Sequence, residues 1–398
     1  MNLRQRVHRA LIIEGEERTA MNLDIPNDIR TLHKAFKAKG RELVVVGGAI
    51  RDAYMGEVPK DWDLASDAPP DEVIKILNTQ RYYIKDIKET GKAFFVIRAF
   101  TDNDEYEIAT YRKDIYGAPE GDDGRRPKSV EITDIVGDMS RRDLTVNALY
   151  YDLDTNEVVD LVGGAEDLKN KRIRSVGSSE QRFGEDKIRI LRAMRFAARL
   201  DGTIDDDMNT VLNAGVDMSQ LAREVVMEEF LKGIKTPKTT GKYLTLLNHY
   251  NLLEQVFPGI IKGKVSEDTF MANQNTKLVV ASLLAPFANP NIESQLMGLK
   301  YSGEFAKDVA FLINTLPNFT PDLISDMKSK RKNVKVSDGE IMEFARIKGL
   351  DERLIQAALS FKYPSVDGNE VAQKFGLQKK ALGDKINALT VNNFRASL

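Results

Sequence analysis

The sequence predicts an α+β fold, in which an α+β head is followed by a long all-α region. As far as residue 177, short runs rich in β-branched and aromatic residues alternate with turns, as in "ELVVVGG" and "YEIATYR". After Gly177 almost every segment has helical periodicity, as in "REVVMEEFLKGI". The 398 residues are enough for two or three domains with separate cores.

Turn residues and helix-start signals give the expected elements in chain order. In the head we expect strands within residues 42–48, 93–101, 106–112, 144–153 and 157–164. The segment 69–78 begins with two prolines and acidic residues and predicts a helix, and the Gly- and Pro-rich segment 116–129 predicts a mobile loop between two strands. Beyond the head, helices are expected over 185–200, 223–234 and 242–257.

The composition argues against several classes of protein. The chain contains no cysteine, which excludes disulfides, zinc–thiolate sites and a cysteine nucleophile. His8, His33 and His249 lie away from the glycine- and carboxylate-rich segments, which argues against a histidine-based triad. No apolar run is long enough to span a bilayer, and the first twenty residues lack the features of a signal peptide. We therefore expect a cytoplasmic protein that does not contact a membrane.

The segment "DWD" places an acid on each side of the only tryptophan in the chain. Residues i and i+2 of a strand point to the same face, so Asp61 and Asp63 would present adjacent carboxylates while Trp62 packs on the opposite face. Adjacent anions repel unless a cation lies between them, and Mg²⁺ binds through one or two carboxylates together with substrate phosphates. The alternative is an exposed edge strand with two solvated acids, and the Asp-x-Asp pattern alone does not decide between them.

Nearby residues favour the interpretation as a metal site. A buried strand runs into Gly47 and Gly48 and then into a short helix, which lets backbone N–H groups approach an anion closely. Arg51 can contact a phosphate there, or it can pair with a neighbouring carboxylate. On another predicted strand, Glu107 alternates with Ala109 and is the candidate for a third carboxylate.

Four ordered motifs resemble the class II tRNA nucleotidyltransferase and bacterial poly(A) polymerase family, within the polymerase β-like nucleotidyltransferases. The motifs are "GGAIRDAYMGEVPKDWDLAS", "RRDLTVNALYYD", "DLVGGAEDLKNKRIR" and "RFGEDKIRILRAMRF". The resemblance is strong over residues 40–260, although Ser66 stands where the family usually has threonine. It implies a mixed sheet in the head and four parts: an N-terminal extension, a catalytic head, a helical neck, and a tRNA-binding body and tail. The corresponding ranges are 1–25, 26–177, 178–260 and 261–398.

The resemblance also implies roles for the residues of these motifs. Asp61 and Asp63 would hold Mg²⁺ and catalyse the addition of nucleotides to tRNA, with CTP and ATP as substrates and pyrophosphate as the leaving group. The implied nucleotide-binding residues of the first two motifs are Gly47, Gly48, Arg51, Arg142, Asp143 and Asn147. Those of the first motif would lie near the triphosphate, and those of the second would contact ribose and phosphates and select a ribonucleotide.

The fourth motif predicts how the base is selected. Asp186 and Arg189 lie one turn apart in the expected helix, so both can face the same point. A carboxylate only accepts hydrogen bonds and a guanidinium only donates them, so the pair fits the amino group and ring nitrogen of cytosine or adenine and rejects uracil and guanine. The alternative is a salt-bridge ladder in which Glu185 or Asp186 pairs with Arg189. Arg192 and Arg195 would contact phosphates or hold the shape of the pocket.

The leading hypothesis is a Mg²⁺-dependent, template-independent enzyme that adds CCA to the 3′ end of tRNA. By the resemblance, retention of the loop over 112–128 favours full CCA addition. The nearest alternative is a poly(A) polymerase or an enzyme that adds only part of the CCA end. More remote alternatives are a non-catalytic RNA-binding protein and a phosphatase with Asp61 as nucleophile, against which the preceding Pro59 and Lys60 argue. The basic runs "KGIKTPKTTGK" and "MKSKRKNVK" are candidate phosphate contacts for tRNA.

Overall fold

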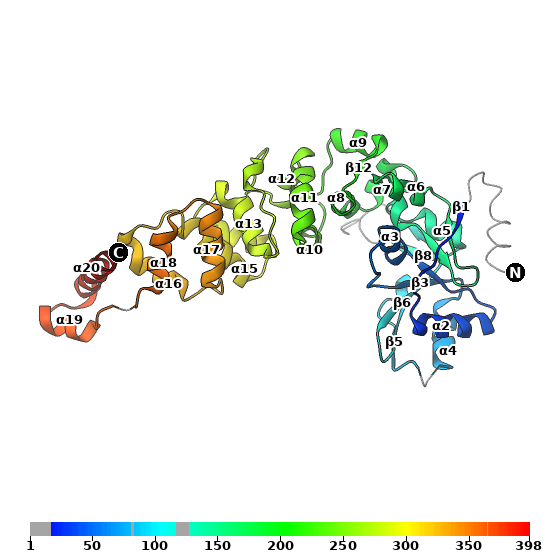
Figure 1. The fold of residues 1–398 in the computed structure, drawn as a ribbon, viewed down its shortest axis with the longest axis horizontal. Helices are drawn as coiled ribbons and strands as arrows, with labels where there is room; N and C mark the ends of the chain where they lie inside the picture. The colour runs from blue at the N-terminus through cyan, green and yellow to red at the C-terminus, as the bar shows by residue number, and fades with distance from the viewer. Residues whose placement is uncertain (1–16, 81–82, 117–126, 364) are drawn as a thin grey trace. The chain divides into compact units, whose positions relative to one another are not determined.

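The chain folds into two compact units. The structure, a computed structural model, describes residues 17–80, 83–116, 127–363 and 365–398. The first unit ends at Leu221 and holds every described strand, whereas the second begins at Ala222 and is helical (Figure 1). This arrangement confirms the predicted α+β class. The finer division of the chain into four parts stays a prediction.

An eight-stranded mixed sheet forms the centre of the first unit, with the strand order β1-β10-β9-β2-β3-β6-β5-β4. β3 and β6 run parallel, and all other neighbouring strands run antiparallel. The strands are β1 (Glu17–Ala20), β2 (Val44–Val46), β3 (Asp63–Ser66), β4 (Asp86–Lys88), β5 (Val96–Phe100), β6 (Glu105–Thr110), β9 (Tyr150–Asp152) and β10 (Glu157–Asp160). The three valines of β2 are all buried, as expected for a strand in the interior of a sheet.

Every strand region predicted in the head contains an observed strand, with one correction. Within 144–153 only β9 is extended, whereas Thr145–Asn147 (η2) forms a 3-10 turn. The turn lies against α6 (Gly164–Lys169), where a Cβ added at Gly164 would lie only 2.2 Å from the Thr145 carbonyl oxygen. This close approach of two backbones explains why glycine occupies that position.

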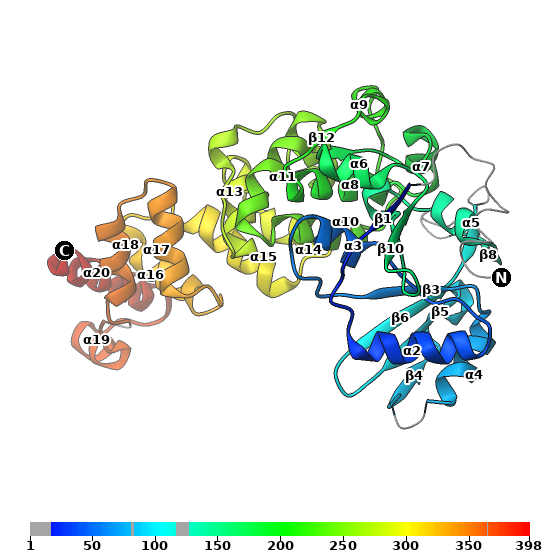
Figure 2. The same ribbon diagram turned by 45° about the vertical axis from the view of Figure 1, so that its right-hand side comes forward.

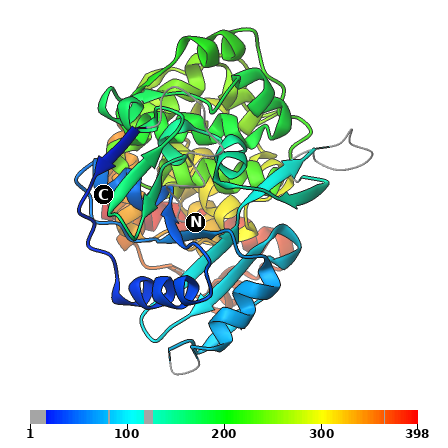
Figure 3. The ribbon, with the colours of Figure 1, turned by 90° about the vertical axis from the view of Figure 1, so that its right-hand side faces the viewer.

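Two amphipathic helices of the first unit lie side by side next to the strands β4 to β6 (Figures 2 and 3). They are α2 (Asn27–Ala38) and α4 (Pro70–Asn78), and α4 packs on β5 and β6. In α2 the buried residues Ile29, Leu32 and Phe36 recur at the helical period. The observed α4 confirms the helix predicted over 69–78.

The predicted N-terminal extension contains an unexpected strand. β1 pairs antiparallel with β10, with Glu17 opposite Asp160, so residues 17–20 form an edge of the head sheet. Residues 1–16 lie outside the part of the chain that the structure describes.

Two strands flank the predicted loop of the head. β7 (Arg112–Ile115) and β8 (Ser129–Ile132) form a separate antiparallel pair, which agrees with the prediction of a loop between two strands. Residues 117–126 of that loop are outside the described ranges.

The helix predicted over 185–200 is interrupted. α7 (Ser179–Glu185) ends before Asp186, which is extended with φ −152° and ψ 104°, and α8 (Ile188–Arg199) begins two residues later. The Asp186 carboxylate accepts a hydrogen bond from the Ile188 backbone N–H at 3.1 Å. Short acidic side chains compete with helical hydrogen bonds in this way, which explains the break.

The second unit is built from helices, and α10 confirms the helix predicted over 223–234. The helix predicted over 242–257 is divided, because Asn251 adopts a left-handed conformation with φ 58°. The helices are α10 (Arg223–Ile234), α11 (Pro237–His249), α12 (Leu252–Val256), α13 (Thr276–Leu284), α14 (Ile292–Gly298), α15 (Gly303–Ala310), η5 (Phe311–Thr315), α16 (Ile324–Arg331), α17 (Asp338–Ile347), α18 (Glu352–Ser360), α19 (Gly368–Phe375) and α20 (Lys379–Ser397). Among the helices that the structure describes, none has the length and apolar character needed to cross a membrane.

Candidate functional site

The two acids of the "DWD" segment are both exposed, while Trp62 between them is 8% exposed. β3 begins at Asp63, so Asp61 lies just before the strand rather than within it. Asp63 is paired in register with Val46, the last residue of β2 and the neighbour of Gly47. The structure therefore brings this acidic segment to the glycine turn at the end of β2.

Glu107 lies beside Asp63, because the two residues are partners in the parallel pairing of β3 with β6. Its carboxylate forms an ion pair with Arg98 at 2.7 Å, and Arg98 also contacts Glu105 at 3.3 Å. The pKa of the Asp63 carboxyl is raised, first by the protein atoms that crowd it and then by the negative charges of Glu107 and Asp61. Three carboxylates thus act on one another at this point of the sheet.

The acids suit a divalent cation that is shared with a phosphate ligand. Within the described residues, no three acidic or histidine side chains gather closely enough to hold a metal ion by themselves. Asp61 and Asp63 are exposed and offer oxygen ligands. Burial is the first cause of the raised pKa of Asp63, and the charges of Glu107 and Asp61 add to it, so a cation would relieve the part that comes from repulsion. Two carboxylates completed by substrate oxygens match the way in which Mg²⁺ binds to proteins.

The glycine turn lies against the second motif. Gly47 has φ 69° and ψ −112°, a conformation that favours glycine, and α3 (Gly48–Tyr54) follows it directly. A Cβ at Gly47 would lie 3.4 Å from the Asn147 carbonyl oxygen and 3.5 Å from NH1 of Arg142. Gly47, Gly48, Arg142 and Asn147, which are far apart in sequence, are therefore brought together.

Arg51 is held by two neighbours and is only 6% exposed. Its Nε and NH2 donate to Oδ1 of Asp52 at 3.0 and 2.8 Å, and its NH1 donates to Oδ1 of Asn147. Arg199 of α8 also contacts Asp52, at 3.1 Å. The carboxylate pairing that the sequence left open for Arg51 is thus present, and Asp52 links α3 to α8.

Asp143 joins the second motif to α8. Its Oδ2 accepts from Nε of Arg192 at 2.7 Å, and its Oδ1 accepts from the Leu144 N–H at 2.8 Å and from Nδ2 of Asn147 at 3.3 Å. Burial alone would raise the pKa of this carboxyl, but the charge and hydrogen bond of Arg192, together with the hydrogen bonds from Leu144 and Asn147, lower the pKa to about 2. Asp143 is therefore ionised and anchors Arg192.

The lowered pKa predicts a loss of stability in acid. A fall from the ordinary value of 3.8 to about 2 corresponds to about 2 kcal/mol of folding stability, which is present above the unfolded pKa. This stability is lost as the pH falls from about 4 towards 2. Urea unfolding followed by Trp62 fluorescence should show this loss in the wild-type chain and not in Asp143→Asn. Equal pH dependence in the two proteins would contradict the assignment.

The sequence did not reveal that Asp138 holds the second motif in place. This fully buried residue of α5 (Ile135–Ser140) accepts from Nε of Arg141 at 2.9 Å, from NH2 of Arg142 at 3.2 Å and from the hydroxyl of Tyr150. Arg142 also donates to Tyr150 at 2.8 Å, and its guanidinium lies over the Tyr150 ring. The i,i+4 spacing of Asp138 and Arg142 is the signal that could have found this contact.

Asp138→Ala should destabilise the first unit by about 3–5 kcal/mol, because it leaves two partly buried guanidinium groups and the buried Tyr150 hydroxyl without their carboxylate. Urea unfolding followed by Trp62 fluorescence measures the change. The matched control is Asp134→Ala, which removes a helix cap from Gly137 at 2.9 Å and should cost about 1 kcal/mol. Equal losses in the two variants would contradict the importance of Asp138.

Arg189 is buried, and the salt bridge that the sequence left as an alternative is present. NH1 pairs with Glu185 at 2.8 Å, while NH2 donates to the Arg141 carbonyl at 3.1 Å and to the Tyr116 hydroxyl at 3.3 Å. Nε forms no hydrogen bond with any residue in the described ranges. Asp186 is half-buried and precedes α8, so it does not lie on the same helix as Arg189, contrary to the expectation.

Three guanidinium groups surround the ring of Phe196, which the sequence did not single out. The distances to the ring centroid are 4.7 Å for Arg51, 5.8 Å for Arg192 and 4.5 Å for Arg195. Cation–π attraction to the ring favours this arrangement and keeps three positive charges close together. Asp52 and Asp143 pair with Arg51 and Arg192 and offset part of this positive charge.

Known proteins resemble this chain in both sequence and fold. Residues 43–174 match the family described as the poly A polymerase head domain. The chain is 33% identical over 295 residues to the CCA-adding enzyme of Lactococcus lactis subsp. lactis, covering 72% of this chain and 71% of that protein. It is 31% identical over 260 residues to poly(A) polymerase I of Salmonella typhi, covering 63% of this chain and 54% of that protein.

The fold is also that of a solved relative. The crystal structure of the Bacillus stearothermophilus CCA-adding enzyme in complex with CTP is similar with a TM-score of 0.67 at 20% identity, covering 93% of this chain and 94% of that one. The matched head domain, the relatives and the shared fold agree with the four sequence motifs. The chain therefore belongs to the class II tRNA nucleotidyltransferase and bacterial poly(A) polymerase family of nucleotidyltransferases.

Proposed function

We propose that this protein adds CCA to the 3′ end of tRNA, using CTP and ATP and releasing pyrophosphate. The observation that carries the proposal is the pair of exposed acids, Asp61 and Asp63, at the glycine turn that ends β2. The negative charges of Glu107 and Asp61, which add to burial in raising the pKa of Asp63, support it, because carboxylates that repel one another favour a shared cation. The relatives that are CCA-adding enzymes support tRNA as the acceptor.

In the proposed reaction, the 3′-hydroxyl oxygen of tRNA attacks the α-phosphorus of the nucleotide and the bond to pyrophosphate breaks. Mg²⁺ held by Asp61 and Asp63 would stabilise the charge on the transferred phosphate and favour ionisation of the attacking hydroxyl. The guanidinium groups around Phe196 would contribute positive charge near the triphosphate, although Asp52 and Asp143 already pair with two of them. Gly47 and Gly48, which lack side chains, let the phosphates approach the backbone of the turn.

Further residues would position the reactants. Asn147 and Asp143, which are joined by a hydrogen bond, would contact the ribose. Glu107 stays a candidate catalytic carboxylate, because its charge acts on Asp63 from the next strand. We assign base selection to Asp186, as acceptor from the amino group, and to Nε of Arg189, as donor to the ring nitrogen.

The decisive experiment supplies the purified protein with Mg²⁺ and a tRNA that ends at the discriminator base. Addition of each labelled nucleotide, singly and together, is followed over time. The proposal expects two cytidines and one adenosine, followed by arrest. Failure to extend the tRNA with any nucleotide would refute nucleotide addition.

The second candidate is poly(A) polymerase activity, which the similarity to poly(A) polymerase I of Salmonella typhi favours. The same time course with ATP alone distinguishes it, because a poly(A) polymerase would produce a growing ladder of adenosines. Enzymes that add only CC or only A would stop earlier or require a tRNA that already ends in CC.

A cytoplasmic location accords with a tRNA substrate and stays a prediction.

A further inference from the structure

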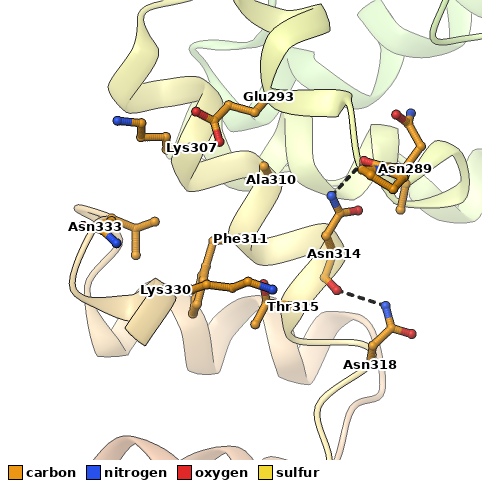
Figure 4. Close-up of a pocket in the computed structure, with 13 residues that line it drawn as sticks. Asn289, Glu293, Lys307, Ala310, Phe311, Asn314, Thr315, Asn318, Lys330 and Asn333 are labelled. Carbon is orange, nitrogen blue, oxygen red and sulfur yellow. Dashed lines mark hydrogen bonds between the residues drawn. The ribbon is translucent and has the colours of Figure 1, made fainter. Parts of the chain in front are cut away.

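A cavity of about 760 Å³ lies within the second unit (Figure 4). It is formed between the segment that leads into α14, the end of α15 with the π-helical turn η5, and the end of α16. All of its lining residues belong to the second unit, whereas the acids and the glycine turn of the candidate active site belong to the first. Its volume falls within the range of about 300–1,000 Å³ that is typical of small-molecule sites.

One part of the cavity wall is apolar. Ala310 and Phe311 line it at the junction of α15 and η5, and Val334 lines it after α16. Phe311 is itself buried, so this wall is fixed by the core. A π-helical turn is rare and is found frequently at functional sites. An apolar wall of this kind can pack against the face of a planar ring.

Asparagine side chains line another part of the cavity in fixed orientations. Nδ2 of Asn314 donates to the Asn289 carbonyl at 2.8 Å, and Nδ2 of Asn318 donates to the Asn314 carbonyl at 3.0 Å (Figure 4). With their amide nitrogens used in this way, the side-chain oxygens of Asn314 and Asn318 form no hydrogen bond with a described residue. They are available as acceptors for the amino or hydroxyl groups of a ligand.

Two lysines on different helices supply positive charge. Lys307 of α15 is exposed and forms no ion pair with any residue that the structure describes. Lys330 of α16 pairs with Asp326 at 2.8 Å, an exposed i,i+4 contact that is worth little and can be exchanged for a phosphate. Glu293 also lines the cavity, which disfavours a bare anion and favours a ligand that carries hydrogen-bond donors as well as negative charge.

We propose that this cavity binds one nucleotide unit, with the base against the apolar wall at Ala310 and Val334 and the asparagine oxygens, and the phosphate near Lys307 and Lys330. The unit is either a free nucleotide or an unpaired nucleotide within RNA. The assignment does not depend on the proposed function of the head. The proposal also gives a role to Lys330. This lysine belongs to the basic run over 327–335, which takes no part in the candidate active site.

A fluorescent label placed at the cavity tests the proposal locally. Because the chain contains no cysteine, Asn333→Cys creates a unique site on the exposed lining for an environment-sensitive fluorophore. The full-length labelled protein is titrated with AMP, with CMP, with inorganic phosphate and with tRNA that lacks its CCA end. We expect a saturable signal from AMP, CMP or the tRNA, and a much weaker one from phosphate.

Second substitutions in the labelled protein identify the site. Ala310→Trp fills the cavity and should abolish the signal, whereas Lys307→Ala should weaken binding about tenfold. Lys262→Ala removes an exposed lysine elsewhere in the same unit and should leave binding unchanged. If Ala310→Trp does not fold, Asn314→Leu replaces it as the variant with impaired binding.

The outcomes distinguish a free nucleotide from a nucleotide within RNA, and they distinguish failure of this proposal from failure of the proposed function. A signal from tRNA alone identifies an unpaired RNA nucleotide, and a signal from AMP or CMP that tRNA does not displace identifies a free nucleotide. No signal from any of these ligands, or a signal that survives Ala310→Trp, overturns the proposal. Addition of CCA by the unlabelled protein is measured in parallel, so failure of one proposal is distinguishable from failure of the other.

Discussion

Asp63→Asn should lower the rate of nucleotide addition by about 10³-fold or more, which corresponds to about 4 kcal/mol of transition-state stabilisation. The amide keeps the size of the side chain but removes the charge that would hold Mg²⁺. The raised pKa of Asp63 shows that its charge is unfavourable in the folded chain, so the substitution should not destabilise the protein. Single-turnover extension of tRNA with labelled CTP measures the rate, and thermal unfolding verifies the fold.

Two further substitutions sharpen this test. Glu105→Gln changes an exposed acid that shares Arg98 with Glu107, and it should leave the rate unchanged. Glu107→Gln should lower the pKa of Asp63, because Glu107 supplies the largest of the neighbouring charges that raise it. A rate loss in Glu107→Gln well beyond that of Glu105→Gln would establish Glu107 as the third catalytic carboxylate. An Asp63→Asn protein with wild-type rate would refute the active site.

Asp186→Ala should abolish most of the preference for CTP and ATP over UTP and GTP. The acceptor for the amino group of cytosine or adenine is removed, and one such contact contributes about 1–3 kcal/mol. The ratio of kcat/KM between CTP and UTP should therefore fall by about 10- to 100-fold. The measurement is single-nucleotide addition to tRNA with each of the four nucleotides in turn.

Another acid of α7 provides the control for this experiment. Glu180 is exposed, so Glu180→Gln should leave both the stability of the fold and the choice of base unchanged. A protein that keeps its base preference after Asp186→Ala would show that this part of the motif has a structural role. The break between α7 and α8 makes the two outcomes separable, because Asp186 lies outside both helices.

The local features of the fold were predictable from the sequence because they depend on short-range patterns. β2 follows from an unbroken valine run, α4 from paired prolines at its start, and α10 from its helical periodicity. The exposure of Asp61 and Asp63 with Trp62 buried between them follows from the two-residue period of extended chain.

Features that depend on partners distant in sequence were not predictable. Glu107 was suggested as a third carboxylate, but only the pairing of β3 with β6 places it beside Asp63. The contacts of Phe196 with three arginines require α3 and α8 to meet, which no periodicity reveals. The break at Asp186 was missed because its flanking residues have continuous helical periodicity, whereas the carboxylate of Asp186 competes for the Ile188 N–H.

The pairing of β1 with β10 has a practical consequence for anyone who shortens this protein. A truncation that starts at α2 would strip the outermost strand from the head and leave one side of β10 with unsatisfied backbone groups. An exposed edge strand can pair with strands of other molecules, so the shortened protein should self-associate. An N-terminal affinity tag should therefore be placed before Glu17, with a spacer that does not disturb the pairing of β1 with β10.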